Sequence, residues 1–366
     1  MSQSAGRAVA FYVSGHGFGH AVRTSELIRR LWALEPELPV VVKTPAPEWL
    51  FGLLTGREVE VEHLECDVGV AQRDSLHVDT AATLHKVRAL VESWDGMIES
   101  EAEACLRAGV GLIVSDIPAV ACLTAKALGV PSIVLANFSW DWIYEGYAAR
   151  EPGFKEVIPP MREAYGSTTL LLKLPMSPAM ETFPRRKEIP LLVRTSDELR
   201  ERLRERLGLK PEERAVLLSF GGIGFEGVRL DALSRLKRYR FVIFGDSADE
   251  SFTNVTVLPH RCPNHHEWVR AADVVVTKPG YGVVAECLAS ATPMLHTSRG
   301  EFAEYPLLVE AIVKHLPNRF VAREEFVAGR WTHLLDELTE EERPAAPVVD
   351  CSGADKAARI ILEQLG

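Results

Sequence analysis

The sequence has no long apolar run, no CxxC cysteine pair and no apolar signal-peptide core near its start. These absences indicate the cellular compartment in which we expect the protein. No apolar run approaches the ~20 residues that a helix needs to cross a bilayer, and the first seven residues lack the apolar core of a signal peptide. The six cysteines are scattered without a CxxC pair, which is typical of free thiols in a reducing compartment. We therefore expect a cytoplasmic protein without an integral membrane segment.

An excess of basic residues is also missing. Lysine and arginine number 41 against 51 aspartate and glutamate residues, so the formal net charge is −10. Nucleic acids and anionic membranes attract basic faces, so we expect neither as the main partner. With 366 residues, of which 47% are hydrophobic and 25% charged, the chain has an ordinary globular composition and enough length for two domains.

Several cofactor motifs are absent. No G-x-x-x-x-G-K-[ST] sequence occurs, which excludes a P-loop, and no D-x-D pair is present to hold a metal on a nucleotide diphosphate. The glycine loop at residues 14–20 reads G-x-G-x-G rather than G-x-G-x-x-G, which argues against a dinucleotide-binding site. The segment 260–266 reads H-x-C-x-x-H-H, which matches no closed zinc pattern, and we interpret it as a loop beside a nucleotide base. The sequence predicts neither a metal nor a resident cofactor.

The sequence does contain a regular alternation of apolar runs and helical patterns. Helical patterns lie at 21–34, 48–54, 80–106 and 120–128. Alternation of this kind predicts an α/β fold with parallel sheets and helices on both faces. The expected strands are Ala8–Val13, Val40–Lys43, Val59–Leu64, Leu112–Ser115, Ser132–Ala136 and Thr169–Leu172, then Ala215–Ser219, Phe241–Phe244, Val274–Thr277 and Met294–Thr297.

A proline-rich stretch at residues 174–190 breaks this alternation and predicts the connection between two domains. We place the first domain at 1–185, the second at 186–350, and a C-terminal helix at 351–366 that packs back towards the first domain. The expected architecture is two doubly wound, Rossmann-like domains that face each other across a cleft, where ligands commonly bind.

The loop after the first expected strand is the most informative segment. Gly17 and Gly19 let the backbone approach a ligand closely, and the helix that follows directs its first N–H groups to the same place. His16 and His20 lie in this loop, and histidine is the side chain best suited to moving protons near neutral pH. The loop therefore predicts a site of chemistry.

Further candidates follow other strands of the first half. Asp116 ends a strand and is placed either to orient a histidine or to cap the next helix. Trp140 and Trp142 follow another strand and either contact an acceptor or pack against the other domain. The polar loop 67–74 supplies Gln72 and Asp74 as further candidates to face an acceptor.

The second half contains three loops of similar design. The segment 217–224 combines glycines with Ser219, which suits phosphate oxygens, with a simple tight turn as the alternative. The segment 277–282 exposes N–H groups before a helix on which Glu286 can reach a ribose or sugar diol. The segment 299–304 carries charges that reach sugar hydroxyls or form a charged helix start.

These motifs together resemble a known family. The segment Ser14-Gly15-His16-Gly17-Phe18-Gly19-His20-Ala21-Val22-Arg23 is similar to the opening motif of the glycosyltransferase-like region of plant L-arabinokinases. Thr277-Lys278-Pro279-Gly280-Tyr281-Gly282 with Glu286, followed by Arg299-Gly300-Glu301-Phe302, is similar to the donor half of that region. The chain also resembles the bacterial transferase that adds N-acetylglucosamine to the peptidoglycan lipid intermediate. Over nearly its whole length it looks like a glycosyltransferase of the two-domain GT-B type.

The resemblance implies a metal-independent, inverting glycosyltransferase. Its co-substrate would be a nucleotide-diphosphate sugar with UDP as the expected nucleotide, and its acceptor a hydroxyl-bearing small molecule or glycan. His20 corresponds to the catalytic base and Asp116 to its carboxylate partner. The implied donor-binding residues are Gly17, Gly19, Ser219, Gly221, Gly222, His260, Lys278, Gly280, Tyr281, Gly282, Glu286, Arg299, Glu301, Phe302 and Glu304. The acceptor candidates are His16, Gln72, Asp74, Trp140 and Trp142.

Several alternatives stay open at this point. Two acids, Glu301 and Glu304, stand where amides usually read the donor sugar, so the sugar is not specified. A nucleotide-sugar hydrolase, a 2-epimerase and a non-catalytic nucleotide-sugar binding protein all fit the same fold. Kinase activity is not implied, because no sugar-kinase phosphate motif is present. A homodimer is compatible with the sequence.

Overall fold

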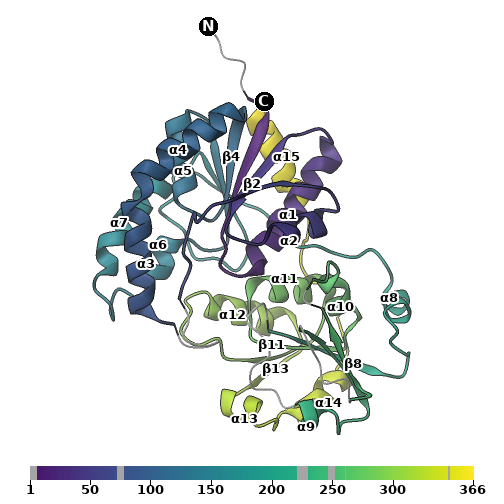
Figure 1. The fold of residues 1–366 in the computed structure, drawn as a ribbon. Coiled ribbons are helices and arrows are strands. Elements are labelled where there is room, and N and C mark those ends of the chain that lie inside the picture. The colour runs from purple at the N-terminus through teal and green to yellow at the C-terminus, as the bar shows by residue number, and fades with distance from the viewer. Residues whose placement is uncertain (1–5, 72–77, 221–229, 246–251, 260, 345–346) are drawn as a thin grey trace. The chain divides into compact units, whose positions relative to one another are not determined.

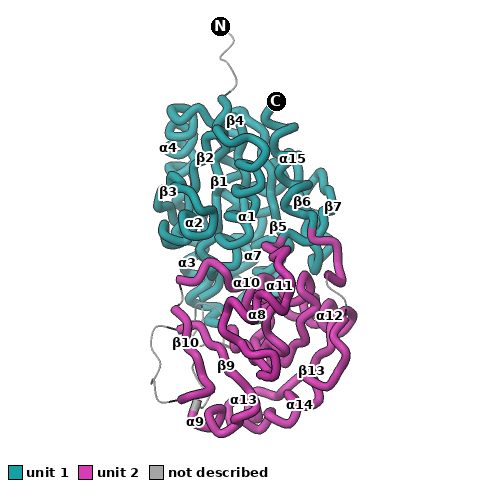
Figure 2. Tube along the Cα trace, turned by 90° about the vertical axis from the view of Figure 1, so that its right-hand side faces the viewer, with its two compact units in different colours: residues 1–192, 301–304, 352–366 teal, residues 193–300, 305–351 magenta. Residues whose placement is uncertain are grey.

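The computed structural model describes residues 6–71, 78–220, 230–245, 252–259, 261–344 and 347–366. Contacts within the chain divide it into two compact units, shown in Figure 2. Unit 1 contains residues 1–192, 301–304 and 352–366, and unit 2 contains residues 193–300 and 305–351. Each unit is built around its own parallel sheet.

Unit 1 contains a seven-stranded sheet in the order β3-β2-β1-β4-β5-β6-β7, and every neighbouring pair is parallel. The central strands are apolar and completely buried, as expected for a sheet covered on both faces. The strands are β1 (Ala8–Val13), β2 (Val40–Thr44), β3 (Glu60–His63), β4 (Val110–Asp116), β5 (Ser132–Ala136), β6 (Leu170–Lys173) and β7 (Arg186–Glu188).

The edge strand β7 corrects one expectation. We predicted no regular element in the proline-rich stretch 174–190, but Arg186–Glu188 pairs with β6 in parallel. All three residues of β7 are exposed, so the strand has no alternating apolar pattern by which the sequence would reveal it.

Helices cover both faces of this sheet, as Figure 1 shows. One face carries α1 (Phe18–Leu34), α2 (Glu48–Thr55) and α15 (Gly353–Leu365). The other carries α3 (Thr80–Glu92), α4 (Trp94–Arg107), α5 (Val120–Leu128), α6 (Trp140–Glu145) and α7 (Phe154–Gly166). The predicted helix 80–106 is two helices, since the chain turns at Ser93, whose hydroxyl donates to the Leu90 carbonyl at 2.7 Å. The C-terminal helix α15 packs on α1, which confirms its predicted return to the first domain.

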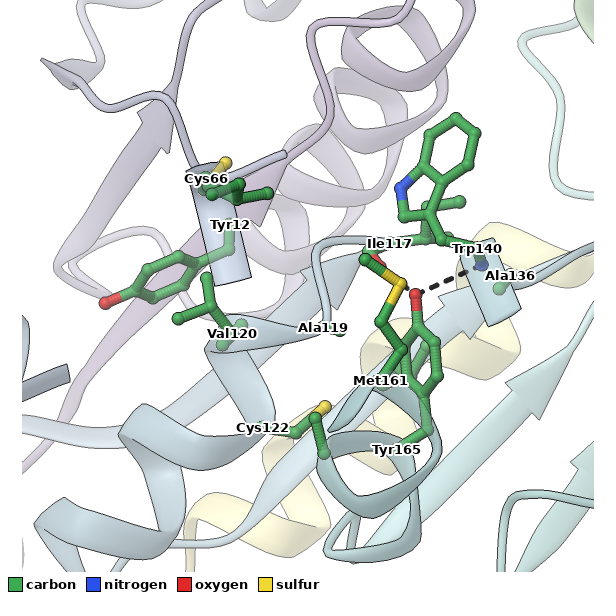
Figure 3. Packing of buried hydrophobic residues seen from close by; sticks show 14 of the residues in the cluster. Tyr12, Cys66, Ile117, Ala119, Val120, Cys122, Ala136, Trp140, Met161 and Tyr165 are labelled. Atoms are coloured by element: carbon green, nitrogen blue, oxygen red, sulfur yellow. Dashed lines mark hydrogen bonds between the residues drawn. The ribbon is translucent and has the colours of Figure 1, made fainter. Parts of the chain in front are cut away.

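The core under α3–α7 holds the end of β4 in place. Alternate residues of β1, namely Ala8, Ala10 and Tyr12, point into this core. Figure 3 shows the hydrogen bond from the Trp140 backbone N–H to the Tyr165 hydroxyl, at 3.3 Å. The same hydroxyl donates to the Ile117 carbonyl at 2.8 Å. These buried bonds fix the chain directly after Asp116.

Unit 2 contains a six-stranded parallel sheet in the order β10-β9-β8-β11-β12-β13. Its strands are β8 (Arg214–Ser219), β9 (Tyr239–Phe244), β10 (Val255–Leu258), β11 (Val274–Thr277), β12 (Met294–Thr297) and β13 (Asn318–Val321). The four strands predicted for this half are confirmed, and β10 and β13 are edge strands that we did not predict. Both edge strands are short and mostly half-buried or exposed. β13 reads Asn-Arg-Phe-Val and has a weak apolar pattern, whereas β10 reads Val-Thr-Val-Leu and could have been predicted from its sequence.

The helices of unit 2 also lie on two faces of its sheet. α8 (Arg200–Arg206), α10 (His265–Ala271), α11 (Tyr281–Ser290) and α12 (Tyr305–His315) form one set, in which α10 packs on α8 and α11. The second set is α9 (Leu230–Leu233), α13 (Arg323–Val327) and α14 (Thr332–Glu340), which contribute to the core on the opposite face. Within the described ranges, no helix is long and apolar enough to cross a membrane.

Candidate active site

The carboxyl ends of β1 and β4 mark the point where the strand order of unit 1 changes direction. β1 pairs with β4 as far as Val13 and Asp116, and the Ser14 N–H donates to the Asp116 carbonyl at 2.8 Å. Ligands of open parallel sheets bind at such a switch point. Gly17 has a φ of 81°, which favours glycine, and is the N-cap of α1. His20 therefore lies in the first turn of α1, directly beside the end of β4.

His20 and Asp116 form a buried hydrogen-bonded pair. The His20 Nδ1 lies 2.8 Å from the Asp116 Oδ1, and the two residues are 6% and 1% exposed. Arg23 Nη2 also lies 3.1 Å from this Nδ1, but the shorter contact with the carboxylate favours a proton on Nδ1. Nε2 is then the ring nitrogen that can accept a proton from a ligand. This is the geometry of a histidine base oriented by a carboxylate. The alternative role for Asp116, capping the next helix, does not hold because Ala119 is the N-cap of α5.

Arg23 and Thr24 keep Asp116 ionised. The Arg23 Nε donates to Oδ2 at 2.6 Å, Arg23 Nη2 donates to Oδ1, and the Thr24 hydroxyl donates to Oδ2 at 3.0 Å. Burial by itself would raise the pKa of Asp116, but the positive charge of Arg23 and the hydrogen bonds outweigh it and lower that pKa to about 2. The carboxylate can therefore stabilise a positive charge on His20.

The cluster continues from Arg23 to Glu304. Arg23 Nη1 donates to the Asn137 Oδ1 at 2.7 Å, and the Asn137 Nδ2 donates to the Glu304 Oε1 at 2.6 Å. Glu304 is 2% exposed and belongs to the segment 301–304, which clusters with unit 1 although its flanking residues belong to unit 2. Sequence reasoning named Glu304 as a donor-binding candidate and missed Arg23 and Asn137. A spacing of three residues from His20 on a helix is the signal that could have identified Arg23.

Asp67 is a second buried carboxylate of this region that the sequence reasoning did not single out. The Trp140 indole N–H donates to the Asp67 Oδ2 at 2.8 Å. Burial raises the pKa of Asp67, although hydrogen bonds from Ser14 and Trp140 and the nearby His20 oppose the shift. Asp67 thus connects the glycine loop to the core. Gly69 follows it with a φ of 58°, and a Cβ there would lie 2.5 Å from the His16 ring.

Aromatic rings pack around the two histidines. The ring of His16 lies 5.5 Å from that of Trp140 and 6.0 Å from that of Phe302, and the ring of Phe138 lies 6.0 Å from that of His20. Trp140 is 1% and Phe302 4% exposed, so both rings are part of the core in this structure. Trp142 packs at the edge of the same core. Two other acceptor candidates, Gln72 and Asp74, lie outside the described residues.

The second candidate region lies where the strand order of unit 2 changes direction, between β8 and β11. Ser219 ends β8 and pairs in register with Thr277, which ends β11. The Ser219 Oγ lies 2.9 Å from the His265 Nε2, and the His265 Nδ1 lies 2.6 Å from the Glu286 Oε2. Burial by itself would lower the pKa of His265, but Glu286 outweighs it and raises that pKa. Sequence reasoning named Ser219 and Glu286 and missed the histidine between them.

The turn between β11 and α11 has the form expected of an anion-binding loop. Gly280 is the N-cap of α11, which begins at Tyr281, and Glu286 lies on α11 with 8% exposure. Lys278 is half-buried at the start of the turn. Within the described structure, a Cβ built at Gly280 or Gly282 would meet no heavy atom within 4 Å. The same is true of Gly17 and Gly19 in unit 1, so a ligand can approach the backbone at all four positions.

The remaining donor candidates are divided between the units. Arg299 is half-buried in unit 2. Glu301 is exposed in unit 1, where Arg150 Nη2 donates to its Oε1 at 2.5 Å. Gly221, Gly222 and His260 lie outside the described residues.

Comparison with known proteins places these observations in a family context. No family model matches the chain. The chain is 30% identical over 330 residues to an L-arabinokinase of Arabidopsis thaliana, a match that covers 89% of this chain and 32% of the relative. It is 22% identical over 286 residues to an uncharacterized glycosyltransferase of Methanopyrus kandleri, with 72% of this chain and 78% of that protein covered. The chain thus spans about a third of the first of these relatives.

Solved structures resemble the chain over its whole length. The glycotransferase of kitacinnamycin matches with a TM-score of 0.65 and 20% identity, covering 98% of this chain and 99% of the other. A UDP-glucosyltransferase from Polygonum tinctorium matches with a TM-score of 0.61 and 14% identity, covering 99% and 94%. The predicted resemblance is confirmed, since these structural neighbours are GT-B glycosyltransferases. Two parallel sheets flanked by helices, matched over the full chain, show that this protein has the GT-B glycosyltransferase fold.

Proposed function

We propose that this protein is an inverting glycosyltransferase that moves a sugar from a nucleotide-diphosphate sugar to a hydroxyl acceptor. The observation that carries the proposal is the buried pair of His20 and Asp116 at the switch point of unit 1. A pair of this kind provides a general base near neutral pH. The fold supports the same reaction class, because one structural neighbour is a UDP-glucosyltransferase.

In the proposed mechanism, the His20 Nε2 removes the proton from the acceptor hydroxyl as its oxygen attacks the anomeric carbon. The bond from this carbon to the diphosphate oxygen breaks, and the nucleoside diphosphate leaves with the electron pair. Attack from the face opposite the leaving group inverts the anomeric configuration. Asp116 stabilises the positive charge that His20 acquires, because Arg23 and Thr24 keep the carboxylate ionised and oriented.

Unit 2 is the proposed donor site, with UDP as the first nucleotide to test. The glycines at 280 and 282 leave room for the diphosphate at the start of α11, where N–H groups stabilise negative charge. Glu286 is placed on the same helix to accept hydrogen bonds from a ribose. In this proposal the reaction needs no metal, since loop N–H groups stabilise the leaving diphosphate.

The proposal is tested by a panel of UDP-, GDP-, ADP- and TDP-sugars with and without hydroxyl acceptors. We expect His20→Ala to lower transfer by at least about a hundredfold, which is the usual contribution of a general base, while nucleotide binding is retained. His63→Ala is the matched control, because the side chain of His63 is 71% exposed, and it should keep full activity. Proton NMR of the product reports the anomeric configuration.

Each outcome of this assay distinguishes one reaction. Transfer with inversion and loss of turnover in His20→Ala support the proposal. Release of nucleotide from the donor without an acceptor would indicate a hydrolase, and a changed sugar on the nucleotide an epimerase. Nucleotide-sugar binding without turnover across the panel would indicate a binding protein. Full activity of His20→Ala would falsify the assignment of the base.

A further inference from the structure

A relay of three side chains in unit 2 has a chemistry that the proposed function does not use. Ser219, His265 and Glu286 come from the end of β8, the start of α10 and the middle of α11. The Ser219 Oγ lies 2.9 Å from one ring nitrogen of His265, and the Glu286 Oε2 lies 2.6 Å from the other. Ser219 and Glu286 are 9% and 8% exposed. Because both nitrogens are engaged, the protonation state of His265 determines what the serine hydroxyl can do.

The two protonation states direct the serine hydroxyl differently. An ionised carboxylate only accepts hydrogen bonds, so the His265 Nδ1 carries a proton towards Glu286 in either state. When His265 is neutral, its Nε2 accepts the Ser219 O–H, and the hydroxyl proton points towards the ring. When His265 is protonated, Nε2–H donates to the Ser219 Oγ, and the serine O–H is then free to donate a hydrogen bond to another acceptor. The relay therefore presents an O–H donor to an anion only when His265 is charged.

The charged groups around His265 influence how readily its ring is protonated. Glu286 on α11 raises the pKa of His265 against the effect of burial. On β8 and β9 the neighbours are the uncharged Ser219 and Phe244, whose ring lies 5.0 Å from that of His265. The packed elements carry further titratable or charged groups, namely His266, Glu267 and Arg270 on α10, Arg200, Glu201, Arg202, Arg204, Glu205 and Arg206 on α8, Cys287 on α11 and Arg194 before α8. Arg206 pairs with Glu267 at 3.0 Å, and burial together with the charge of Arg194 lowers the pKa of His266.

We propose that His265 takes up a proton when the diphosphate of a donor binds at Ser219, and that the protein thereby gains a positive charge at the diphosphate. The inference rests on the proposed function, because it assumes that the anion is the diphosphate of a nucleotide sugar. The anion accepts a hydrogen bond from the Ser219 O–H, and the proton that His265 takes up from solvent balances part of the charge of the anion. His265 acts here as a positioning residue, since its two ring nitrogens are engaged by Ser219 and Glu286.

The pH dependence of binding follows from this linkage. The anion stabilises the protonated relay, so the pKa of His265 is higher in the complex than in the free protein. Donor affinity should therefore increase as the pH falls through the pKa of the complex and level off below that of the free protein. A UDP-sugar is a suitable probe because its diphosphate diester does not titrate near neutral pH, whereas free UDP does.

The experiment is calorimetric titration of UDP-glucose into the 366-residue chain in buffers of different ionisation enthalpy. We expect uptake of up to about one proton per donor bound near neutral pH. His265→Gln should abolish this uptake and weaken binding by about tenfold at low pH, as expected for a lost charge-assisted hydrogen bond. His266→Gln is the matched control on the same helix and should retain the uptake.

A second variant keeps the test decisive where His265→Gln does not fold. Ser219→Ala leaves the histidine and Glu286 in place but removes the hydroxyl, so its donor binding should be weaker and its proton uptake smaller. Donor binding by the wild type without proton uptake, or uptake that persists in His265→Gln, overturns this inference and leaves the proposed function intact. No binding of any nucleotide sugar by the wild type overturns the proposed donor and this inference together.

Discussion

Asp116 is the residue on which the cluster around His20 depends. Its two oxygens accept hydrogen bonds from His20, Arg23 and Thr24, and its side chain is almost completely buried. A buried ion pair as a whole contributes modestly to stability. Removal of one member is costly, because it leaves the other charge buried without a partner. Asp116 therefore combines a proposed catalytic role with a structural one, and the two roles can be separated by experiment.

The first prediction concerns the substitution Asp116→Asn. The amide cannot balance the charge of Arg23 or stabilise protonated His20, so we expect kcat to fall by about 10³-fold or more and the free energy of unfolding by about 3–5 kcal/mol. Asp95→Asn is the control, since this exposed residue on α4 should change stability by less than about 0.5 kcal/mol. Loss of stability with an unchanged kcat would assign Asp116 a structural role alone.

The second prediction is how the contribution of Asp116 to the free energy of unfolding depends on pH. The pKa of Asp116 is about 2 in the folded protein, below the value of about 3.9 expected in the unfolded chain. The stabilisation by ionised Asp116 is therefore fully present above the pKa of the unfolded chain, and it is lost as the pH falls through the pKa of the folded protein. It amounts to about 2–3 kcal/mol. We expect the free energies of unfolding of the wild type and of Asp116→Asn, measured with denaturant, to differ less at low pH than near neutral pH. A difference that stays constant between about pH 2 and 6 would contradict the linkage.

At the scale of elements, the loop after β3 supports the glycine loop after β1. Gly69 has a φ of 58°, and a Cβ at this position would lie 2.5 Å from the His16 Nδ1. Its carbonyl accepts a hydrogen bond from the buried Tyr144 hydroxyl at 2.9 Å. The chain therefore needs a residue without a side chain here, and His16 occupies the space that a side chain would take.

The third prediction is the effect of Gly69→Ala. The positive φ and the contact with His16 should lower the free energy of unfolding by about 1–3 kcal/mol and reduce turnover by displacing the glycine loop. Gly52→Ala is the matched control, because this glycine lies inside α2 with 3.7 Å to the nearest atom, and it should stabilise the protein by about 0.5–1 kcal/mol. Equal effects of the two substitutions in thermal unfolding would contradict the proposed packing.

The elements that could be predicted from the sequence are those with a strong local pattern. Buried strands such as Ala8–Val13 and Val274–Thr277 are continuous apolar runs, and the structure confirms them. Exposed or half-buried edge strands such as Arg186–Glu188 have no such pattern and were missed. The boundary at Ser93 was also missed, because a serine within a helical pattern does not by itself indicate a break.

The candidate site could be predicted only in part, for a similar reason. Glycines and histidines in one loop form a local signal, and this identified His20. The contacts of Asn137 with Arg23 and Glu304 join residues far apart in the sequence, so no local pattern reveals them. His265 lay in a segment that we interpreted as a loop beside a nucleotide base, and only His260 was named from it. The partners of His265, Ser219 and Glu286, lie on other elements, so no local pattern reveals them.

At the scale of the whole molecule, the chain returns twice to unit 1 after it has begun unit 2. Residues 301–304 contribute the buried side chains of Phe302 and Glu304, and residues 352–366 contribute α15. Each unit has its own hydrophobic core. Unit 1 is therefore complete only when residues 352–366 are present, and its stability should depend on them.

The last prediction tests this dependence with Ile361→Ala. Ile361 is completely buried on α15, which packs on α1, so its truncation should cost about 2–5 kcal/mol. Hydrogen exchange should show faster exchange of amides in α1 and β1 and little change in β8 and β11, because the two sheets belong to different cores. Leu106→Ala is the control, since this aliphatic side chain on α4 is 58% exposed and its loss should leave both units unchanged. Uniform destabilisation of both sheets by Ile361→Ala would show that the units do not unfold separately, whereas an effect confined to unit 1 would show that α15 stabilises the unit that carries His20.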